Sequence, residues 1–193
     1  MKNDELLTRL AGIDLFQGLS KRALRQVIRA GRQTEHPDGR EVILRSMLQS
    51  AGLDDRVIVD SAGTGGWHEG DEADPRTVRA LKDHGYGGTH HRAREFRPEW
   101  FSERDLIVVA DEGHLRDLRR WAPDADASAK VRLLREFDQS AVHSGTLEVD
   151  DPYFGDAEGF DQCLTVVERA CRGIVERLRV ELAEGSEPAE SRT

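Results

Sequence analysis

The chain has 193 residues, of which 37% are hydrophobic and 34% are charged, and its net charge is −9. This composition is typical of one folded domain with a short extension and a well-solvated surface. An acidic surface repels nucleic acid, and no apolar run approaches the roughly 20 residues of a membrane span. The first residues also lack the continuous apolar core of a signal peptide, so we expect a cytoplasmic protein that binds neither nucleic acid nor membrane.

Residues 4–30 have the apolar spacing of two helices. Gly18 interrupts the pattern, and Ser20 is suited to cap the second helix. The apolar positions of the two helical faces are Leu6, Leu7, Leu10, Ile13, Leu24, Val27 and Ile28. We therefore expect residues 1–40 to form a helical segment.

This first segment resembles the opening of a cyclic-nucleotide-binding domain. The resemblance rests on Leu-Thr-Arg-Leu-Ala-Gly-Ile-Asp-Leu-Phe at 7–16, Gly-Leu-Ser at 18–20 and Pro-Asp-Gly at 37–39. Such domains hold the cyclic phosphate with a later glycine-rich segment that contains an arginine, and nothing after Gly39 provides one. We expect no cyclic-nucleotide binding. A helical surface for a protein partner is an alternative, and it would be marked by an exposed apolar stripe along Leu10, Ile13, Phe16 and Leu19.

From Glu41 the pattern becomes that of alternating helices and strands. A helix is predicted over 41–50, and the β-branched run at 57–59 predicts a buried strand. The glycine-rich loop after this strand carries Ser61, Thr64 and Trp67 at a carboxyl end of the sheet, where open α/β folds bind their ligands. A plain turn is the alternative explanation of the glycines.

The remaining elements continue the alternation. We expect strands over 106–109 and 131–134, and helices over 75–84, 112–121 and 157–182. An acidic and aromatic turn at 150–156 precedes the last helix, and residues 185–193 are expected to be a disordered tail. Strands that alternate with helices predict an α/β fold with a parallel sheet flanked by helices.

Residues 41–182 resemble the low-molecular-weight protein tyrosine phosphatases, and the bacterial ones most closely, and we expect a domain of this kind over 41–184. The motifs are Ser-Ala-Gly-Thr-Gly-Gly-Trp-His at 61–68, Ala-Asp-Pro-Arg at 73–76, His-Gly-Tyr at 84–86, His-Arg-Ala-Arg at 91–94 and Asp-Pro-Tyr-Phe-Gly at 151–155. The resemblance implies a four-stranded parallel sheet, of which the sequence shows three strands. It also implies a first strand followed by a loop of Cys, five residues and Arg, in which the cysteine is the nucleophile.

Residues 1–40 contain no cysteine. We therefore expect the first strand and the phosphate loop of the family to be replaced by the helical N-terminal segment. The segment 33–42 could complete the sheet, but Pro37 and Gly39 make it a poor central strand. The protein would then be a phosphatase-like protein without activity.

Two stretches, Cys163 to Arg169 and Cys171 to Arg177, have the spacing of the missing loop. Both continue one amphipathic helix, whose N–H groups are already bonded within the helix and cannot surround an anion. We expect both cysteines to be packing residues, although an active phosphatase that uses one of them is an alternative. No histidine or cysteine has metal-ligand spacing, so neither a metal nor another cofactor is expected.

The resemblance also assigns roles to individual side chains. Asp151 corresponds to the general acid, and aromatic walls beside the substrate correspond to Trp67, Tyr153 and Phe154. Ser61 and His91 correspond to residues that brace the phosphate loop, or are plain structural residues here. An interaction module without enzymatic activity is the third hypothesis for the whole chain.

Overall fold

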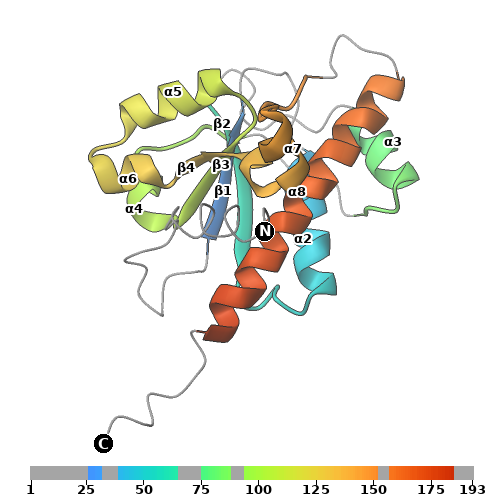
Figure 1. Cartoon of the computed structure of the whole chain (residues 1–193), viewed down its shortest axis with the longest axis horizontal. Coiled ribbons are helices and arrows are strands. Elements are labelled where there is room, and N and C mark those ends of the chain that lie inside the picture. Colours follow the sequence, from blue (N-terminus) through green and yellow to red (C-terminus); the bar gives the residue numbers. More distant parts are fainter. Residues whose placement is uncertain (1–25, 32–38, 65–74, 88–93, 152–156, 185–193) are drawn as a thin grey trace, which may run out of the picture.

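The computed structural model describes residues 26–31, 39–64, 75–87, 94–151 and 157–184 (Figure 1). In this part of the chain four strands form one sheet in the order β2-β1-β3-β4, and every neighbouring pair is parallel. The strands are β1 (Gln26–Gly31), β2 (Ile58–Gly63), β3 (Leu106–Val109) and β4 (Val131–Leu133). The predicted α/β fold with a parallel sheet flanked by helices is confirmed.

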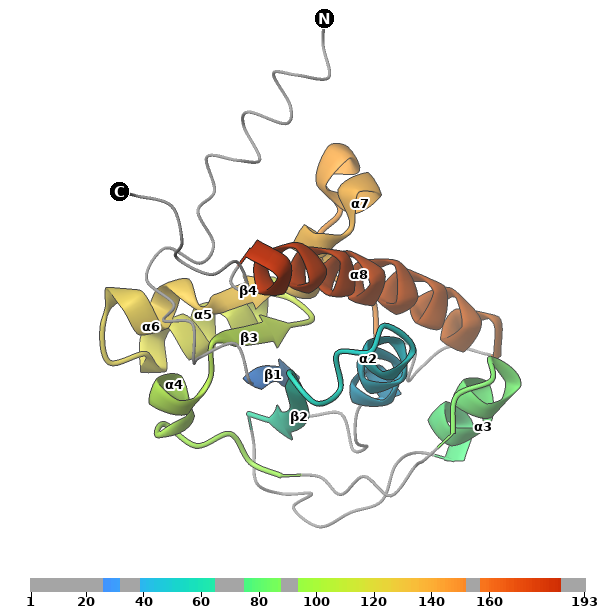
Figure 2. The ribbon, with the colours of Figure 1, turned by 90° about the horizontal axis from the view of Figure 1, so that it is seen from below.

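Helices cover both faces of the sheet (Figures 1 and 2). One face packs against α2 (Gly39–Ser50) and α8 (Ala157–Glu184), and α3 (Pro75–Asp83) packs against these two helices. The other face packs against α4 (Trp100–Glu103), α5 (Glu112–Trp121) and α6 (Ala125–Ala129). The short elements η1 (Leu134–Phe137) and α7 (Gln139–Ser144) follow β4. Among the described helices, none is both long and apolar enough to cross a membrane.

Strand β3 shows why apolar residues do not alternate with polar ones in the apolar runs of this sequence. Leu106 and Val108 belong to the core on the α8 side, whereas Ile107 and Val109 belong to the core on the α5 side. All four side chains are buried. A strand that is covered by helices on both faces has no solvent side, so apolar residues are favoured at every position.

Strand β1 corrects the prediction for the first 40 residues. Residues 26–31 were expected to end a helix that buries Val27 and Ile28, but they form the second strand of the sheet, between β2 and β3. Hydrogen bonding to a neighbour on each side, together with the β-branched pair, outweighs the local helical spacing. The expectation of a sheet with its first strand missing is therefore wrong.

Helix α2 begins at Gly39, two residues before the predicted start. Of the segment 33–42, residues 39–42 belong to α2, and the place between β2 and β3 is taken by β1. The first 25 residues, residues 32–38 and the tail from 185 lie outside the described residues. The predicted helices before Gln26, with the apolar stripe Leu10, Ile13, Phe16 and Leu19, lie there too.

Candidate functional site

The candidate site lies at the carboxyl ends of the parallel strands, where β1 leads toward α2 and β2 leads into its loop. Of the predicted site residues, Ser61 and Asp151 are described. The others lie outside the described residues, namely Trp67, His91, Tyr153 and Phe154.

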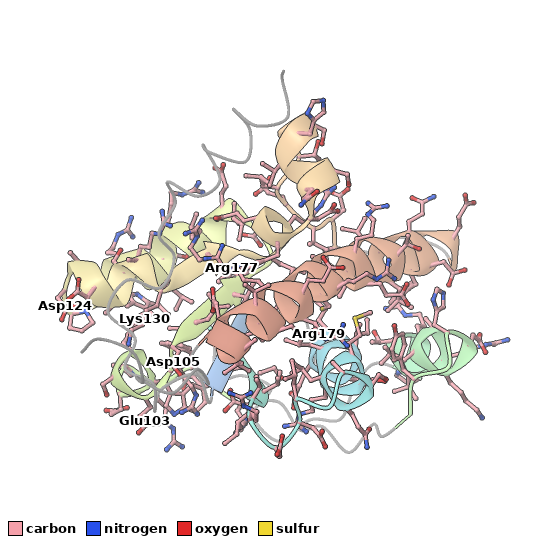
Figure 3. The ribbon with its side chains drawn as sticks, turned by 60° about the horizontal axis from the view of Figure 1, so that its bottom comes forward. Glu103, Asp105, Asp124, Lys130, Arg177 and Arg179 are labelled. Carbon is pink, nitrogen blue, oxygen red and sulfur yellow. The ribbon has the colours of Figure 1, made fainter. Side chains whose placement is uncertain are left out.

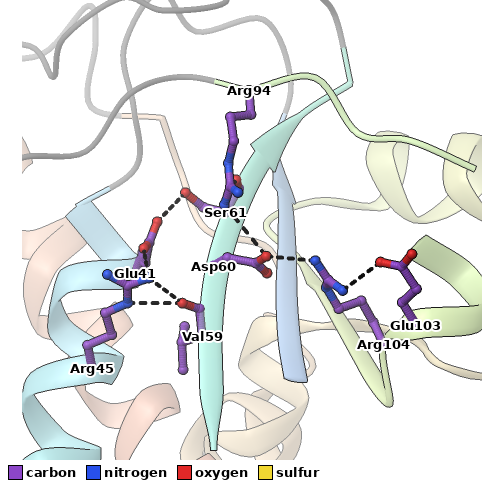
Figure 4. Close-up of polar contacts among 8 residues, drawn as sticks. All are labelled: Glu41, Arg45, Val59, Asp60, Ser61, Arg94, Glu103 and Arg104. Atoms are coloured by element: carbon purple, nitrogen blue, oxygen red, sulfur yellow. Dashed lines mark hydrogen bonds and ion pairs between the residues drawn. The ribbon is translucent and has the colours of Figure 1, made fainter. Parts of the chain in front are cut away.

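Ser61 is buried on β2 and faces α2 (Figure 4). Its hydroxyl donates a 2.6 Å hydrogen bond to Oε2 of Glu41, a buried carboxylate in the first turn of α2. A carboxylate in the first turn interacts favourably with the positive end of the helix. Ser61 thus connects β2 to the start of α2, where the sequence had suggested no partner for it.

Arg45 completes this contact from the next turn of α2. Its guanidinium lies 2.7 Å from Oε1 of Glu41, so both carboxylate oxygens are engaged by charge or hydrogen bond. The same guanidinium donates from Nε and from a terminal nitrogen to the carbonyl oxygen of Val59, at 2.9 and 2.6 Å. Helix α2 is therefore hydrogen-bonded to β2 at two positions, Val59 and Ser61 (Figure 4).

Asp60 points to the opposite face of the sheet, as alternation along a strand requires. Its carboxylate Oδ2 lies 2.9 Å from the guanidinium of Arg104 and 3.6 Å from that of Arg94 (Figure 4). Both guanidinium groups also lie over the ring of Trp100, at 5.1 and 5.6 Å from its centre. Two cations thus offset the cost of burying the Asp60 carboxylate.

Asp151 is exposed, and the segment before it is anchored to the sheet. The N–H of Val149 donates to the carbonyl of Ala110, the residue after β3, at 2.9 Å. Glu148 accepts two further hydrogen bonds of 2.9 Å, at Oε1 from the N–H of Glu112 and at its carbonyl from Arg135. The predicted general acid therefore follows a segment held at the carboxyl end of β3.

Ser61 lies near the same level of the sheet as Ala110, the residue that holds the segment before Asp151. It is in register with Val108 of β3, because both pair with the same residue of β1. Ala110, where the Asp151 segment is anchored, is two residues farther along β3. The structure thus places Ser61 and Val149, which is two residues before Asp151, near the carboxyl end of the sheet on two separate segments.

Both cysteines lie in α8. Cys171 is fully buried in the core, and Cys163 is half-buried. The helix runs without interruption through both stretches that have the Cys, five residues, Arg spacing. Their arginines form ion pairs, Arg169 with Asp138 at 3.1 Å and Arg177 with Glu181 at 2.8 Å; Arg177 is labelled on α8 in Figure 3. The prediction that both cysteines lie in a helix is confirmed.

The charged network around Ser61 was not predicted from the sequence. Glu41 and Arg45 are four residues apart in a predicted helix, and this spacing was an available signal for an ion pair. Nothing in the sequence joins Asp60 to Arg104, which follows it by 44 residues. Within the described residues, no three histidine, cysteine or acidic side chains are placed to hold a metal ion.

Comparisons with known proteins agree on one family. The family profile described as "Low molecular weight phosphotyrosine protein phosphatase" matches residues 39–184. A low molecular weight protein-tyrosine-phosphatase of Streptomyces coelicolor is 53% identical over 139 residues, which cover 72% of this chain and 84% of that protein. Low molecular weight protein-tyrosine phosphatase A of Mycobacterium tuberculosis is 42% identical over 135 residues, covering 69% of this chain and 78% of that protein.

Solved structures show the same similarity. A protein tyrosine phosphatase from Entamoeba histolytica has a TM-score of 0.74 and 25% identity, and the match covers 81% of this chain and 98% of that protein. The family profile begins to match at Gly39, the first residue of α2, and so does not include β1.

Proposed function

The chain belongs to the low molecular weight phosphotyrosine protein phosphatase family, and from that premise we propose that it is a phosphatase-like protein without phosphatase activity. The proposal rests on one observation. The chain contains two cysteines, Cys163 and Cys171, and both lie within α8. In the family that the sequence resembles, the nucleophile is a cysteine in a loop after the first strand. Residues 1–40, which supply β1 and the chain that follows it, contain none.

The surroundings of the two cysteines support the proposal. Cys171 is fully buried among apolar side chains, and a buried structural cysteine is chemically inert. The N–H groups of a continuous helix are bonded to carbonyls four residues earlier, so they cannot surround a phosphate. The arginines of both stretches are already paired, with Asp138 and with Glu181.

The expected loss of activity is large. In a well-studied protease, removal of the nucleophile from a cooperating catalytic unit lowers the rate by about a millionfold. Asp151 could still donate a proton, but a general acid assists a leaving group only when a nucleophile attacks. What remains is a folded scaffold with an exposed Asp151, which suits a binding or regulatory role better than a catalytic one.

The test is hydrolysis of p-nitrophenyl phosphate by the purified full chain, with the heat-denatured chain as background. The two single variants Cys163→Ser and Cys171→Ser are assayed beside it, and a catalytically active relative of the family serves as positive control. We expect the wild type and both variants to stay at background.

Turnover of the wild type at about 1 s⁻¹ or faster, the ordinary range of enzymes, would contradict the proposal. Loss of that turnover in one of the two serine variants would identify the nucleophile. Turnover that both variants keep would still contradict the proposal, because it would require a nucleophile other than cysteine.

A further inference from the structure

Exposed apolar side chains gather at the amino end of the sheet, where its parallel strands begin. The described residues include four large apolar side chains that are exposed, namely Ile58, Trp121, Val142 and Val180. Val142 lies on α7, after β4, and the other three lie around the amino end. A single exposed apolar residue needs no explanation, but several around one end of a fold are typical of a surface that another segment covers.

Contacts with the strands place Ile58 and Trp121 at this end. Ile58 is the first residue of β2 and is 50% exposed. Trp121 ends α5, and Arg119 in the same turn donates a 3.0 Å hydrogen bond to the carbonyl of Val131, the first residue of β4. The two apolar side chains therefore lie at the starts of the two edge strands.

Val180 lies at the same end, on the helix that covers the opposite face of the sheet. Two residues after it, the carbonyl of Leu182 accepts a 3.2 Å hydrogen bond from Arg56, which precedes β2 by two residues. The last turns of α8 are therefore held beside the start of β2.

The leading segment, residues 1–25, joins the sheet at this same end. It is followed by Gln26, the first residue of β1, which is the register partner of Ile58. In the helical conformation that its spacing predicts, the apolar stripe of this segment is about 14 Å long. The three strand spacings from β2 to β4 also amount to about 14 Å. The residues of the stripe are Leu10, Ile13, Phe16 and Leu19.

Charge favours contact between the leading segment and this end. The segment carries five basic and three acidic side chains, in a chain whose net charge is −9. The turns that lead into the two neighbours of β1 are acidic, with exposed Asp54 and Asp55 before β2 and exposed Glu103, labelled in Figure 3, before β3. Arg104, the basic residue of the second turn, is buried and donates to Asp60.

We propose that the leading segment covers the amino end of the sheet in the folded chain, with its apolar stripe against Ile58 and Trp121. Because the segment is joined directly to β1, its effective concentration at this surface is about millimolar. It therefore occupies the surface in preference to a second copy of the chain or a separate protein at lower concentration. The proposal goes beyond the loss of activity and does not depend on it, because no residue of the candidate catalytic site takes part.

The test measures how fast a thiol at this surface reacts in the full chain. Ile58→Cys places a reporter under the proposed cover, and Val142→Cys places one at the exposed apolar position on α7. Rates with a water-soluble disulfide reagent are measured for both, and the reaction of the wild type is subtracted as background. Each reporter is combined with Phe16→Glu, which puts a charge in the stripe, and with the matched control Ala11→Glu, which puts the same charge outside it.

We expect Phe16→Glu to raise the rate at Ile58→Cys by about tenfold, which corresponds to about 1.4 kcal/mol of docking free energy. Ala11→Glu should leave that rate unchanged, and neither change should alter the rate at Val142→Cys. An unchanged rate at Ile58→Cys in the Phe16→Glu variant would overturn the proposal. Equal acceleration at both reporters, or with both charged variants, would also overturn it, because the stripe would then not be the cover. A rate at Ile58→Cys that falls as protein concentration rises would overturn it in favour of a second copy.

Discussion

The hydroxyl of Ser61 and the carboxylate of Glu41 form a 2.6 Å hydrogen bond between β2 and the first turn of α2, and both side chains are buried. This bond fixes the start of the helix against the sheet at the edge where the candidate site lies. It also shows that Ser61 has a structural role that is independent of catalysis.

Replacing Ser61 by alanine should weaken the fold. The change leaves a buried carboxylate oxygen without this donor, and hydrogen bonds to charged groups contribute about 1.5–3 kcal/mol. We expect the free energy of unfolding, measured by urea denaturation, to fall by about 2 kcal/mol. Ser102→Ala is the control, because the Ser102 hydroxyl donates at an exposed position to the carbonyl of Glu99. Equal stability of the two variants would show that the buried bond contributes nothing.

Gly173 lies where α8 passes close to the backbone of η1. A Cβ atom at this position would lie 1.8 Å from the carbonyl oxygen of Phe137, a backbone atom that cannot move aside easily. In an unobstructed helix, Gly→Ala stabilises by about 1 kcal/mol. Here overpacking, which costs about 1–3 kcal/mol or more, should reverse the sign.

We therefore expect Gly173→Ala to lower both the thermal midpoint and the free energy of unfolding. Gly87→Ala, outside the helices, is the control without a steric clash, because a Cβ atom there meets nothing within 4 Å. A stabilised Gly173→Ala variant would mean that α8 and η1 are farther apart than the structure places them.

Elements with a regular apolar pattern along their own residues were predictable from the sequence. Strand β3 was predicted at residues 106–109 because both of its faces are buried and its four residues are all apolar. Helix α8 was predicted from apolar residues at steps of three and four, and its buried positions follow that spacing. In both cases the environment is uniform along the element, so the pattern alone identifies it.

Strand β1 could not be predicted in this way. Its six residues include Gln26 and Arg29, and they follow a segment with helical spacing. Their strand conformation depends on pairing with residues 58–63 and 106–109, which are far away in the sequence. The same applies to the site. Ser61 was identified from its motif, but the pairing of Asp60 with Arg104 depends on the folded sheet.

Asp138 joins α7 to α8 and should make the protein sensitive to acid. Burial by itself raises the pKa of this carboxyl. Hydrogen bonds from the Ser140 side chain, from Arg169 and from the N–H groups of Ser140 and Ala141 outweigh that effect and lower the pKa from 3.8. A lowered pKa in the folded state contributes stability above the unfolded value, and this stability is lost as the pH falls through the folded value.

Asp138→Asn should accordingly reduce the free energy of unfolding at neutral pH and flatten its decline below pH 3.8. Urea denaturation at a series of acidic pH values measures both effects. Asp83→Asn, at an exposed carboxylate paired with Arg79, should leave the acid decline as it is in the wild type. Parallel curves for Asp138→Asn and the wild type would exclude Asp138 as the source of the acid sensitivity.

Tyr86 should make the protein sensitive to alkali. Burial, the hydrogen bond that the phenol donates to Glu168 at 2.9 Å and the negative charge of that carboxylate raise the pKa of Tyr86 from 10.0 to about 12. Because the pKa is higher in the folded state, the stabilising contribution is complete below pH 10 and is lost as the pH rises toward about 12. Tyr86 belongs to the turn after α3, so its ionisation should loosen the contact of this turn with α8.

The chain has two tyrosines, Tyr86 and Tyr153, so ultraviolet titration of a Tyr153→Phe variant reports Tyr86 alone. We expect the phenolate absorbance of that variant to appear near pH 12 in the folded protein and near pH 10 in urea. Glu168→Gln should move the folded-state titration toward pH 10, because it removes the negative charge but keeps an acceptor for the phenol. A folded-state titration near pH 10 in the Tyr153→Phe variant would mean that the Tyr86–Glu168 contact does not form in solution.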